Sequence, residues 1–197
     1  MCGRYLLSTE DENIEYKEII NKIYERYKNA PPMLLKSGEI FPTDIAPVIT
    51  AENSKQAAAL LKWGFPKRQG SGVIINARAE TALEKISFRG PLANRRCAVP
   101  AAGFFEWRHE EGKKVKYLFK NADLSLLYFA GLYGSFAKTY DAFVILTIRA
   151  NEYVSDYHSR MPLILESKNI DRWLCDTGYA LSRLNSPCGA KLYASMV

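Results

Sequence analysis

Four short stretches carry polar residues that a purely apolar core would not place there. They are CGR (2–4), INARAE (75–80), AGFFEW (102–107) and HSRMP (158–162). The groups able to do chemistry are a thiol, an amide, a carboxyl group and an imidazole, at Cys2, Asn76, Glu106 and His158. The first, second and fourth stretches also supply guanidinium groups, whose forked donors suit phosphates, at Arg4, Arg78 and Arg160.

Cys2 stands directly after the initiator methionine and before Gly3. Initiator methionine is usually removed when the next side chain is small. The chain would then begin with an α-amine and a thiol on adjacent carbons, a pair that no internal cysteine offers. The structural alternative is a small residue at the start of a buried strand.

Glu106 follows two phenylalanines and precedes Trp107. Aromatic surroundings desolvate a carboxyl group and raise its pKa from about 4.3 toward neutrality, which suits a general acid or base. The alternative is a structural ion pair with an arginine. His158 lies before an apolar run and has a reference pKa near 6.5, suited to proton transfer, although a lone histidine also serves as a structural residue.

The remaining polar and aromatic candidates are less specific. Asn76 would orient a substrate or cap a turn, and in an extended strand Asn76, Arg78 and Glu80 would share one face. Trp63 and Trp107 offer flat faces for nucleic-acid bases, or else belong to the core.

The composition is that of a globular protein with one domain, residues 1–197. Apolar residues make up 48% and charged residues 24% of the chain. With no apolar run long enough for a membrane span and no secretory signal, we expect a cytoplasmic protein without a membrane partner. Its four cysteines are far apart, and neither histidine is at ligand spacing from one, so we expect reduced thiols, no metal and no cofactor.

The net charge of +6 is unevenly distributed. Residues 60–120 contain 13 Lys and Arg against 5 Asp and Glu. A basic surface confined to one region favours a partner with phosphate groups, with a solvated, solubilising face as the alternative.

The elements that must position these residues follow from local patterns. Residues 13–27 have helical spacing, with Thr9 and Glu12 as a predicted capping box. Short apolar, β-branched runs predict strands, residues 109–114 predict a hairpin loop, and residues 169–177 predict a short helix. The predicted strands are 45–50, 57–63, 72–77, 97–101, 115–120, 125–133, 142–149 and 191–197. We therefore expect an α+β fold built on a curved, largely antiparallel, barrel-like sheet with a few flanking helices.

Taken together and in order, the motifs resemble a known family. MCGRY, INARAET, RRCAVPAAGFFEW and HSRMPLIL, with the lesser WGF (63–65) and ILT (145–147), are similar to motifs of the SRAP family, the SOS-response-associated peptidases or abasic-site processing proteins. The resemblance extends from residue 2 to about residue 165. It implies a protein that binds single-stranded DNA containing an abasic site and attaches itself covalently to the sugar aldehyde.

The resemblance also implies roles for individual residues. Cys2 would form the link, Asn76 would hold Cys2 and the sugar, Glu106 would transfer protons, and His158 would assist opening of the sugar ring. DNA contacts would come from a wider set, in which exposed Pro42 and Phe88 would act as wedges: Arg4, Arg78, Trp63, Trp107, Thr147, Arg160, Pro42 and Phe88. We expect a monomer.

Two other functions remain open from the sequence. The first is a cysteine peptidase using Cys2, His158 and either Glu106 or Asn76, for which removal of Met1 would be a minimal activity. The second is a non-catalytic single-strand binder, whose affinity would survive Cys2→Ala and fall steeply with salt.

Overall fold

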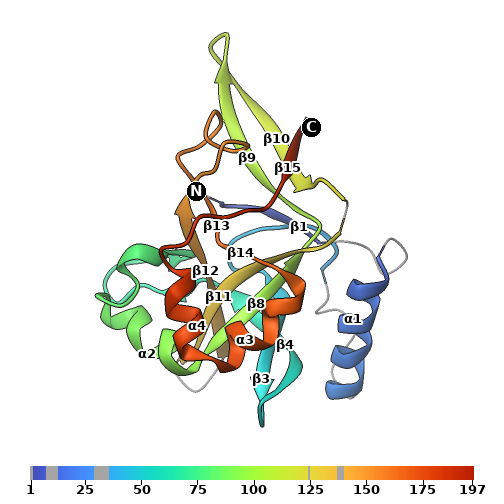
Figure 1. Ribbon diagram of the computed structural model, residues 1–197, viewed down its shortest axis with the longest axis vertical. Helices are drawn as coiled ribbons and strands as arrows, with labels where there is room; N and C mark the ends of the chain where they lie inside the picture. The colour runs from blue at the N-terminus through green and yellow to red at the C-terminus, as the bar shows by residue number, and fades with distance from the viewer. Residues whose placement is uncertain (1, 8–12, 29–35, 124, 137–139) are drawn as a thin grey trace.

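Five long strands pair in a closed ring at the centre of the structure, a computed structural model (Figure 1). It describes residues 2–7, 13–28, 36–123, 125–136 and 140–197. The ring strands are β3 (Ile45–Glu52), β4 (Lys55–Trp63), β8 (Arg96–Ala101), β11 (Leu127–Phe136) and β12 (Tyr140–Arg149). They pair in the order β12–β4–β3–β8–β11–β12, and only the β4–β12 pairing is parallel. The predicted α+β fold on a curved, largely antiparallel sheet is confirmed.

Short strands extend this ring at its margins. They are β7 (Asn76–Arg78) and β13 (Arg160–Pro162), both paired with β12, and β14 (Ile164–Leu165), paired with β11. A separate small hairpin consists of β5 (Phe65–Pro66) and β6 (Val73–Ile74). The single strand predicted over 72–77 is therefore wrong, because the chain forms β6 and then the separate strand β7.

A second sheet lies beside the ring. Its strands, in spatial order, are β15 (Leu192–Met196), β10 (Lys113–Asn121), β9 (Gly103–Glu110), β1 (Tyr5–Leu7) and β2 (Gly38–Ile40). The β9–β10 hairpin projects from the body of the molecule (Figure 1), and its turn uses positive φ at Glu111 and Gly112. Gly103 begins β9 where the backbone is crowded, since a Cβ there would lie 2.5 Å from the Phe119 carbonyl oxygen.

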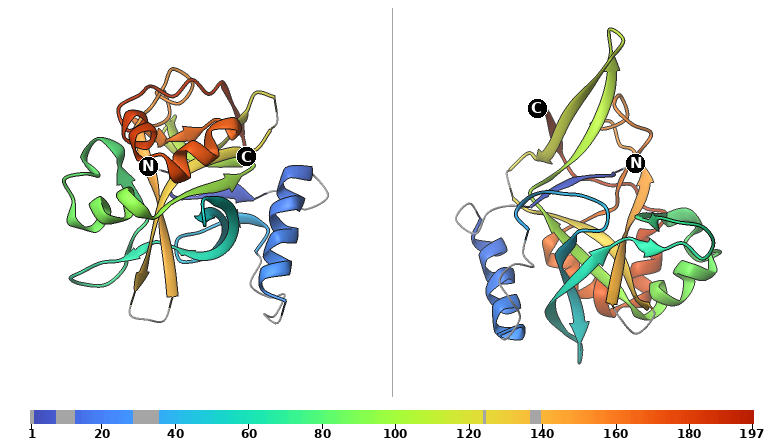
Figure 2. Two further views of the ribbon diagram at one scale, coloured as in Figure 1. Left: turned by 60° about the horizontal axis from the view of Figure 1, so that its bottom comes forward. Right: turned by 180° about the vertical axis from the view of Figure 1, so that it is seen from behind.

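Four helices are described outside the sheets. They are α1 (Ile14–Arg26), α2 (Ile86–Asn94), α3 (Ile170–Cys175) and α4 (Thr177–Arg183), with 3₁₀ helices at Ala79–Thr81 and Ser167–Asn169. Helix α1 confirms the prediction and stands against β3 and β4 at one side (Figure 2). The Asn13 side chain caps it by accepting from the Tyr16 N–H, whereas Thr9 and Glu12 lie outside the described residues.

The C-terminal helical segment differs from the prediction. Residues 169–177 do not form one helix, because Asp176 ends α3 and its side chain caps α4 by accepting from the Tyr179 N–H. Helix α2 is not predicted at all.

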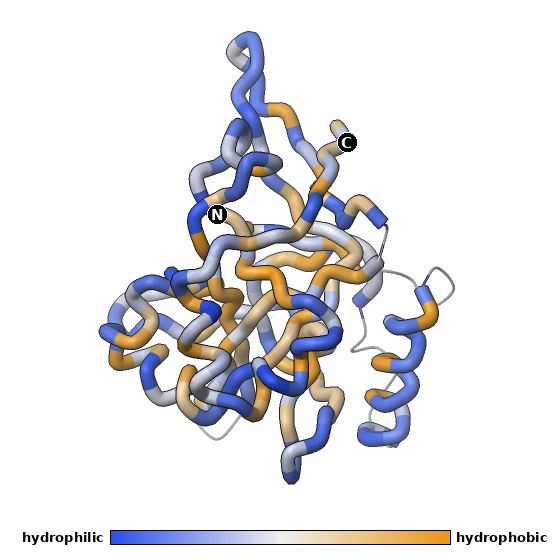
Figure 3. The backbone as a smooth tube through the Cα atoms, viewed as in Figure 1, coloured by the Kyte–Doolittle hydropathy of each residue, from blue (hydrophilic) through white to orange (hydrophobic). Residues whose placement is uncertain are grey.

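Large apolar side chains fill the space between the two sheets. Tyr5 packs edge-on against Trp63 and Phe129, with ring centroids 5.1 and 6.1 Å apart. Apolar residues concentrate on the central strands, whereas the tip of the β9–β10 hairpin is hydrophilic (Figure 3). Among the described helices, none combines the length and the apolar character needed to cross a membrane.

Candidate functional site

Cys2 lies at the entrance to β1 and is completely buried. Its thiol approaches the Arg4 carbonyl oxygen at 3.6 Å. Burial, and then the negative charge of Glu106, raise the pKa of the thiol well above its usual value. The thiol is therefore protonated at neutral pH.

Asn76 joins the start of β7 to Cys2. Its side-chain Nδ2 donates to the Cys2 carbonyl oxygen at 2.8 Å. Its Oδ1 is buried and accepts no hydrogen bond from the described residues. Buried acceptors are normally satisfied, so this oxygen is available to a donor on a bound substrate.

Glu106 lies on β9 and is only 3% exposed. Because side chains alternate along a strand, Glu106 points to the opposite face from Phe105 and Trp107. Burial raises the pKa of Glu106, and nearby positive charge, that of His158 included, opposes this shift. The pKa of Glu106 is thus raised, as expected, and the cause is burial of the carboxyl group within the fold.

His158 stands just before β13 and is half-buried. Its Nδ1 accepts a hydrogen bond of 2.9 Å from the Arg160 backbone N–H. In the neutral ring this leaves the proton on Nε2. The imidazole is therefore held in one orientation close enough to Glu106 to influence its ionisation.

These contacts bring together four residues from distant parts of the chain. A hydrogen bond joins Cys2 to Asn76, and electrostatic interactions join Glu106 to Cys2 and to His158. The group contains a thiol, a carboxyl group of raised pKa, an oriented imidazole and an amide, which together can support nucleophilic addition with proton transfer.

Arg160 makes a different contact from the one expected. Its Nη1 and Nη2 donate to the two carboxylate oxygens of Glu80 at 2.6 and 2.8 Å, and Nη2 also donates to the Thr147 carbonyl oxygen. Its guanidinium group is thus paired with Glu80 in the free protein, and its contact with a phosphate stays a prediction. Glu80 lies in the 3₁₀ helix Ala79–Thr81, so strand β7 ends at Arg78 and Glu80 does not continue the face of Asn76 and Arg78.

Four more of the predicted DNA contacts are buried or partly buried, and for two of them, Trp63 and Phe88, burial contradicts the prediction. Trp63 is completely buried, donates from Nε1 to the Ile75 carbonyl oxygen at 3.0 Å and stacks on Phe143, so it has no face for a base. Thr147 is also completely buried. Phe88, expected to be an exposed wedge, is buried on α2, and Pro42 is only half-exposed.

Arg4, Arg78 and Trp107 keep accessible surface. Arg78 is exposed at the end of β7, two residues after Asn76. The Arg4 guanidinium lies 5.2 Å from the centre of the Trp107 ring and donates to Glu39 at 3.1 Å. Glu39 has no signal in the sequence, because nothing in its neighbourhood marks an isolated glutamate.

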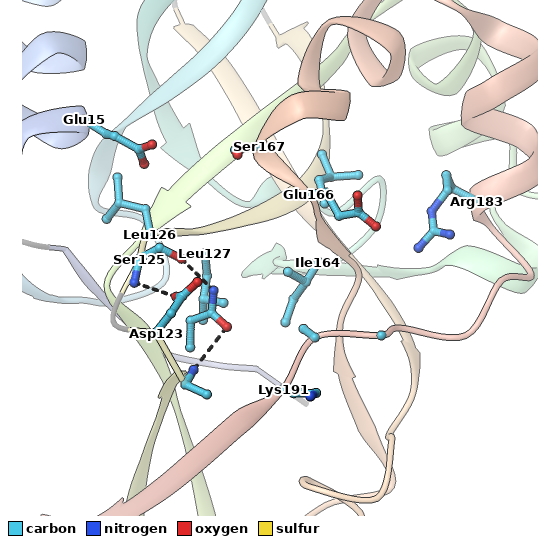
Figure 4. A pocket seen from close by; sticks show the side chains of 15 residues that line it. Glu15, Asp123, Ser125, Leu126, Leu127, Ile164, Glu166, Ser167, Arg183 and Lys191 are labelled. Atoms are coloured by element: carbon cyan, nitrogen blue, oxygen red, sulfur yellow. Dashed lines mark hydrogen bonds between the residues drawn. The ribbon is translucent and has the colours of Figure 1, made fainter.

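A separate cleft of about 520 Å³ opens between β11, β14 and the segment before β15 (Figure 4). Leu127, Ile164, Arg183 and Lys191 are part of its lining, which includes none of Cys2, Asn76, Glu106 and His158. Within the described ranges, no group of three or more His, Cys, Asp or Glu is placed to hold a metal ion.

Comparison with known proteins gives consistent matches over almost the whole chain. The family described as SOS response associated peptidase (SRAP) matches residues 1–196. The abasic site processing protein YoqW of Bacillus subtilis is 34% identical over 184 residues, which cover 88% of this chain and 80% of YoqW. The abasic site processing protein YedK of Escherichia coli is 26% identical and covers 88% of this chain and 79% of its own length.

Solved structures agree on the fold. A Bacteroides thetaiotaomicron protein superposes with a TM-score of 0.76 at 26% identity, covering 100% of this chain and 92% of that one. A Bordetella bronchiseptica protein has the same TM-score at 24% identity, with 100% and 99% covered, which bears on the fold alone.

Proposed function

Because the chain belongs to the SOS response associated peptidase (SRAP) family, we propose that it processes abasic sites in DNA by bonding covalently to them through Cys2. The relatives YoqW and YedK, which carry the name abasic site processing protein, support the choice of lesion. The observation that carries the chemistry is the hydrogen bond from Asn76 to the Cys2 carbonyl oxygen, beside the raised-pKa carboxyl group of Glu106.

The reaction starts from Cys2 as the first residue, after removal of Met1. An α-amine has a pKa of about 7.7–8.0, against about 10.4 for lysine, so a useful fraction is uncharged at pH 7. This amine adds to the aldehyde of the ring-opened abasic sugar, and loss of one water gives an imine. The Cys2 thiol then adds to the imine carbon, its proton passes to the ring nitrogen, and a five-membered thiazolidine results.

Glu106 serves both steps as a proton carrier. In its protonated form it gives a proton to the departing hydroxyl group during imine formation. The resulting carboxylate accepts the thiol proton, since the buried thiol is not ionised beforehand, and the proton is passed on to the nitrogen. A raised pKa keeps both forms of Glu106 accessible.

His158 and Asn76 orient the reacting groups and assist the reaction. The Nε2–H of His158 is suited to help open the sugar ring to its aldehyde. Asn76 fixes the Cys2 backbone, and its Oδ1 is suited to accept from a sugar hydroxyl group.

Single-stranded DNA is the proposed partner because the reactive group is recessed. An abasic sugar within a stacked duplex cannot easily reach a completely buried Cys2. Arg78 and Arg4, close in sequence to Asn76 and Cys2, supply positive charge for the flanking phosphates.

A peptidase function fits the site less well. A cysteine peptidase needs a thiolate of lowered pKa, whereas burial raises the pKa of the Cys2 thiol.

The test is a denaturing gel with intact-mass analysis. Protein with a free N-terminal Cys2 is mixed with a single-stranded oligonucleotide that carries one abasic site, and an oligonucleotide with all bases intact is the control. We expect a heat-stable adduct with the mass of protein plus DNA minus one water. If no adduct forms, the proposed function is wrong.

A further inference from the structure

Glu39, on the edge strand β2, pairs with two cations, Lys116 on β10 and Arg4 directly before β1. Lys116 Nζ donates to both carboxylate oxygens at 2.9 Å, and Arg4 Nη1 donates to one of them at 3.1 Å. The side chains of Arg4, Glu39 and Lys116 keep 37%, 26% and 24% of their surface exposed. The charged trio is therefore organised by the protein but open to solvent.

Aromatic rings frame these three charges. Lys116 Nζ lies 4.0 Å from the centre of the Phe105 ring, and the Arg4 guanidinium lies 4.6 Å from that of Phe41. Trp107 also faces Arg4 and is half-exposed. The charged trio and these three rings form what we call the Glu39 cluster. Cations interleaved with flat rings are typical of surfaces that bind single-stranded nucleic acid.

The Glu39 cluster adjoins the reactive residue. Arg4 is two residues from Cys2, which corresponds to about 7 Å of extended chain. Trp107 follows Glu106 directly and lies on the outer face of β9. A strand whose sugar reacts at Cys2 therefore has its neighbouring phosphate within reach of Arg4 and Lys116.

At neutral pH the Glu39 carboxylate is fully ionised and competes with a phosphate for the donors of Arg4 and Lys116. Burial alone would raise the pKa of Glu39, but hydrogen bonds from Lys116 and Arg4 lower it overall. Its charge and its acceptor oxygens match what a phosphate would offer to the same two donors.

We propose, on the basis of the function proposed above, that the Glu39 carboxylate occupies in the free protein the place between Arg4 and Lys116 that a DNA phosphate takes on binding. Binding then exchanges one anion for another, and Glu39 turns toward solvent. The exchange lowers the affinity for single strands with all bases intact, so the protein dissociates from them quickly. A strand with an abasic site is retained, because the covalent bond to Cys2 forms before release.

The test compares two substitutions that make the same change in net charge. Glu39→Gln removes the competing anion, and Glu52→Gln removes the exposed partner of Arg26, at 2.6 Å, in a pair between α1 and β3. The probe is a fluorescent single-stranded oligonucleotide with all bases intact, and the measurement is anisotropy at several salt concentrations. We expect Glu39→Gln to bind roughly 3- to 10-fold tighter than wild type, with a salt slope steeper by about 0.7 for each additional phosphate that the protein neutralises.

The control variant separates this effect from net charge. Glu52→Gln should bind within about twofold of wild type, as expected for an exposed charge distant from the bound strand. If Glu39→Gln binds no tighter than Glu52→Gln, the exchange is refuted. Failure of wild type to bind any single strand would instead refute the function proposed above.

A second pair of variants tests the proposed exchange if Glu39→Gln does not fold. Lys116→Gln removes one donor of the proposed phosphate position, and Lys168→Gln removes a lysine that is 79% exposed and bound to Glu166. Lys116→Gln should bind more weakly than Lys168→Gln and have the shallower salt slope. Equal affinities for these two variants would also refute the exchange.

Discussion

At the scale of single residues, burial decides the order of events at Cys2. The raised pKa keeps its thiol neutral, so the α-amine is the group able to attack first. The thiol acts only when an imine carbon lies beside it. The two nucleophilic groups of one residue thus have separate roles.

Substitution of Cys2 tests this order. Cys2→Ala keeps the amine but lacks the thiol, so we expect no heat-stable adduct and nearly unchanged affinity for single-stranded DNA. Cys2→Ser should give only a labile imine that borohydride traps, as seen by denaturing gel and intact mass. A heat-stable adduct from Cys2→Ala without borohydride would contradict the role of the thiol.

Glu106 links activity to pH and stability. Its raised pKa means that folding disfavours the carboxylate, so the stability of the protein falls as the pH rises from the usual 4.5 to the folded pKa, stays lowered above it, and is unaffected by this residue below pH 4.5. Glu106→Gln should therefore raise the Tm at pH 8, by about 2–4 °C for each kcal/mol of added stability, and leave it nearly unchanged at pH 4. Thermal melts at the two pH values measure this.

The same variant should lose activity. Removal of the proton carrier is expected to slow adduct formation about 10²-fold or more, as followed by quenched time points on a denaturing gel. A Glu106→Gln variant that reacts at the wild-type rate would contradict its role as the proton carrier.

At the scale of elements, one buried arginine on β8 joins helices α2 and α3 to the ring through hydrogen bonds. Arg96, the first residue of β8, donates to the carbonyl oxygens of Leu92 and Ala93 in α2 and of Trp173 and Leu174 in α3. Burial lowers its pKa. Its N–H groups donate to carbonyl oxygens near the C-terminal ends of two helices, where no further helical turn supplies N–H donors.

Loss of this guanidinium should be costly. Arg96→Leu leaves several buried carbonyl groups without donors, so we expect a loss of roughly 2–4 kcal/mol in the free energy of unfolding. Arg95→Leu, at the exposed neighbouring position, should change it by less than about 0.5 kcal/mol. Urea unfolding measures both, and similar values for the two variants would contradict the bracing role of Arg96.

At the scale of the whole molecule, positive charge must guide the strand to a recessed site. Arg78→Ala should weaken binding of any single strand and lower the salt slope by about 0.7, the value for one phosphate contact. Arg172→Ala on α3 is the matched control and should change neither quantity. Fluorescence anisotropy across salt concentrations measures both variants, and unchanged affinity for Arg78→Ala would contradict its phosphate contact.

Local patterns are enough to predict much of the fold. Helix α1 and most of the long strands follow from the spacing and β-branched character of nearby residues. Helix α2 does not, because Gly90 and Pro91 within it obscure the helical pattern. Closure of the ring does not follow either, since the parallel pairing of Trp63 with Phe143 joins residues far apart in sequence.

The candidate site, like the fold, is predictable from the sequence only in part. Its reactive residues stand in recognisable motifs, but their contacts do not. The Arg160–Glu80 pair spans 80 residues and the Lys116–Glu39 pair spans 77. Burial of Trp63 and Phe88 depends on which strands and helices cover them, and no local pattern specifies that.

The complete burial of Cys2 has a consequence for biosynthesis. The proposed chemistry requires the removal of Met1, and a Cys2 side chain that is buried in the finished fold offers a processing enzyme less of the N-terminus to bind than an unfolded chain does. The residues gathered around Cys2 extend to His158, and at about 5–20 residues per second the ribosome needs roughly 8–30 s to reach that point. We therefore expect Met1 to be removed fastest from the nascent chain, and a folded protein that keeps Met1 would lack the free α-amine that forms the imine.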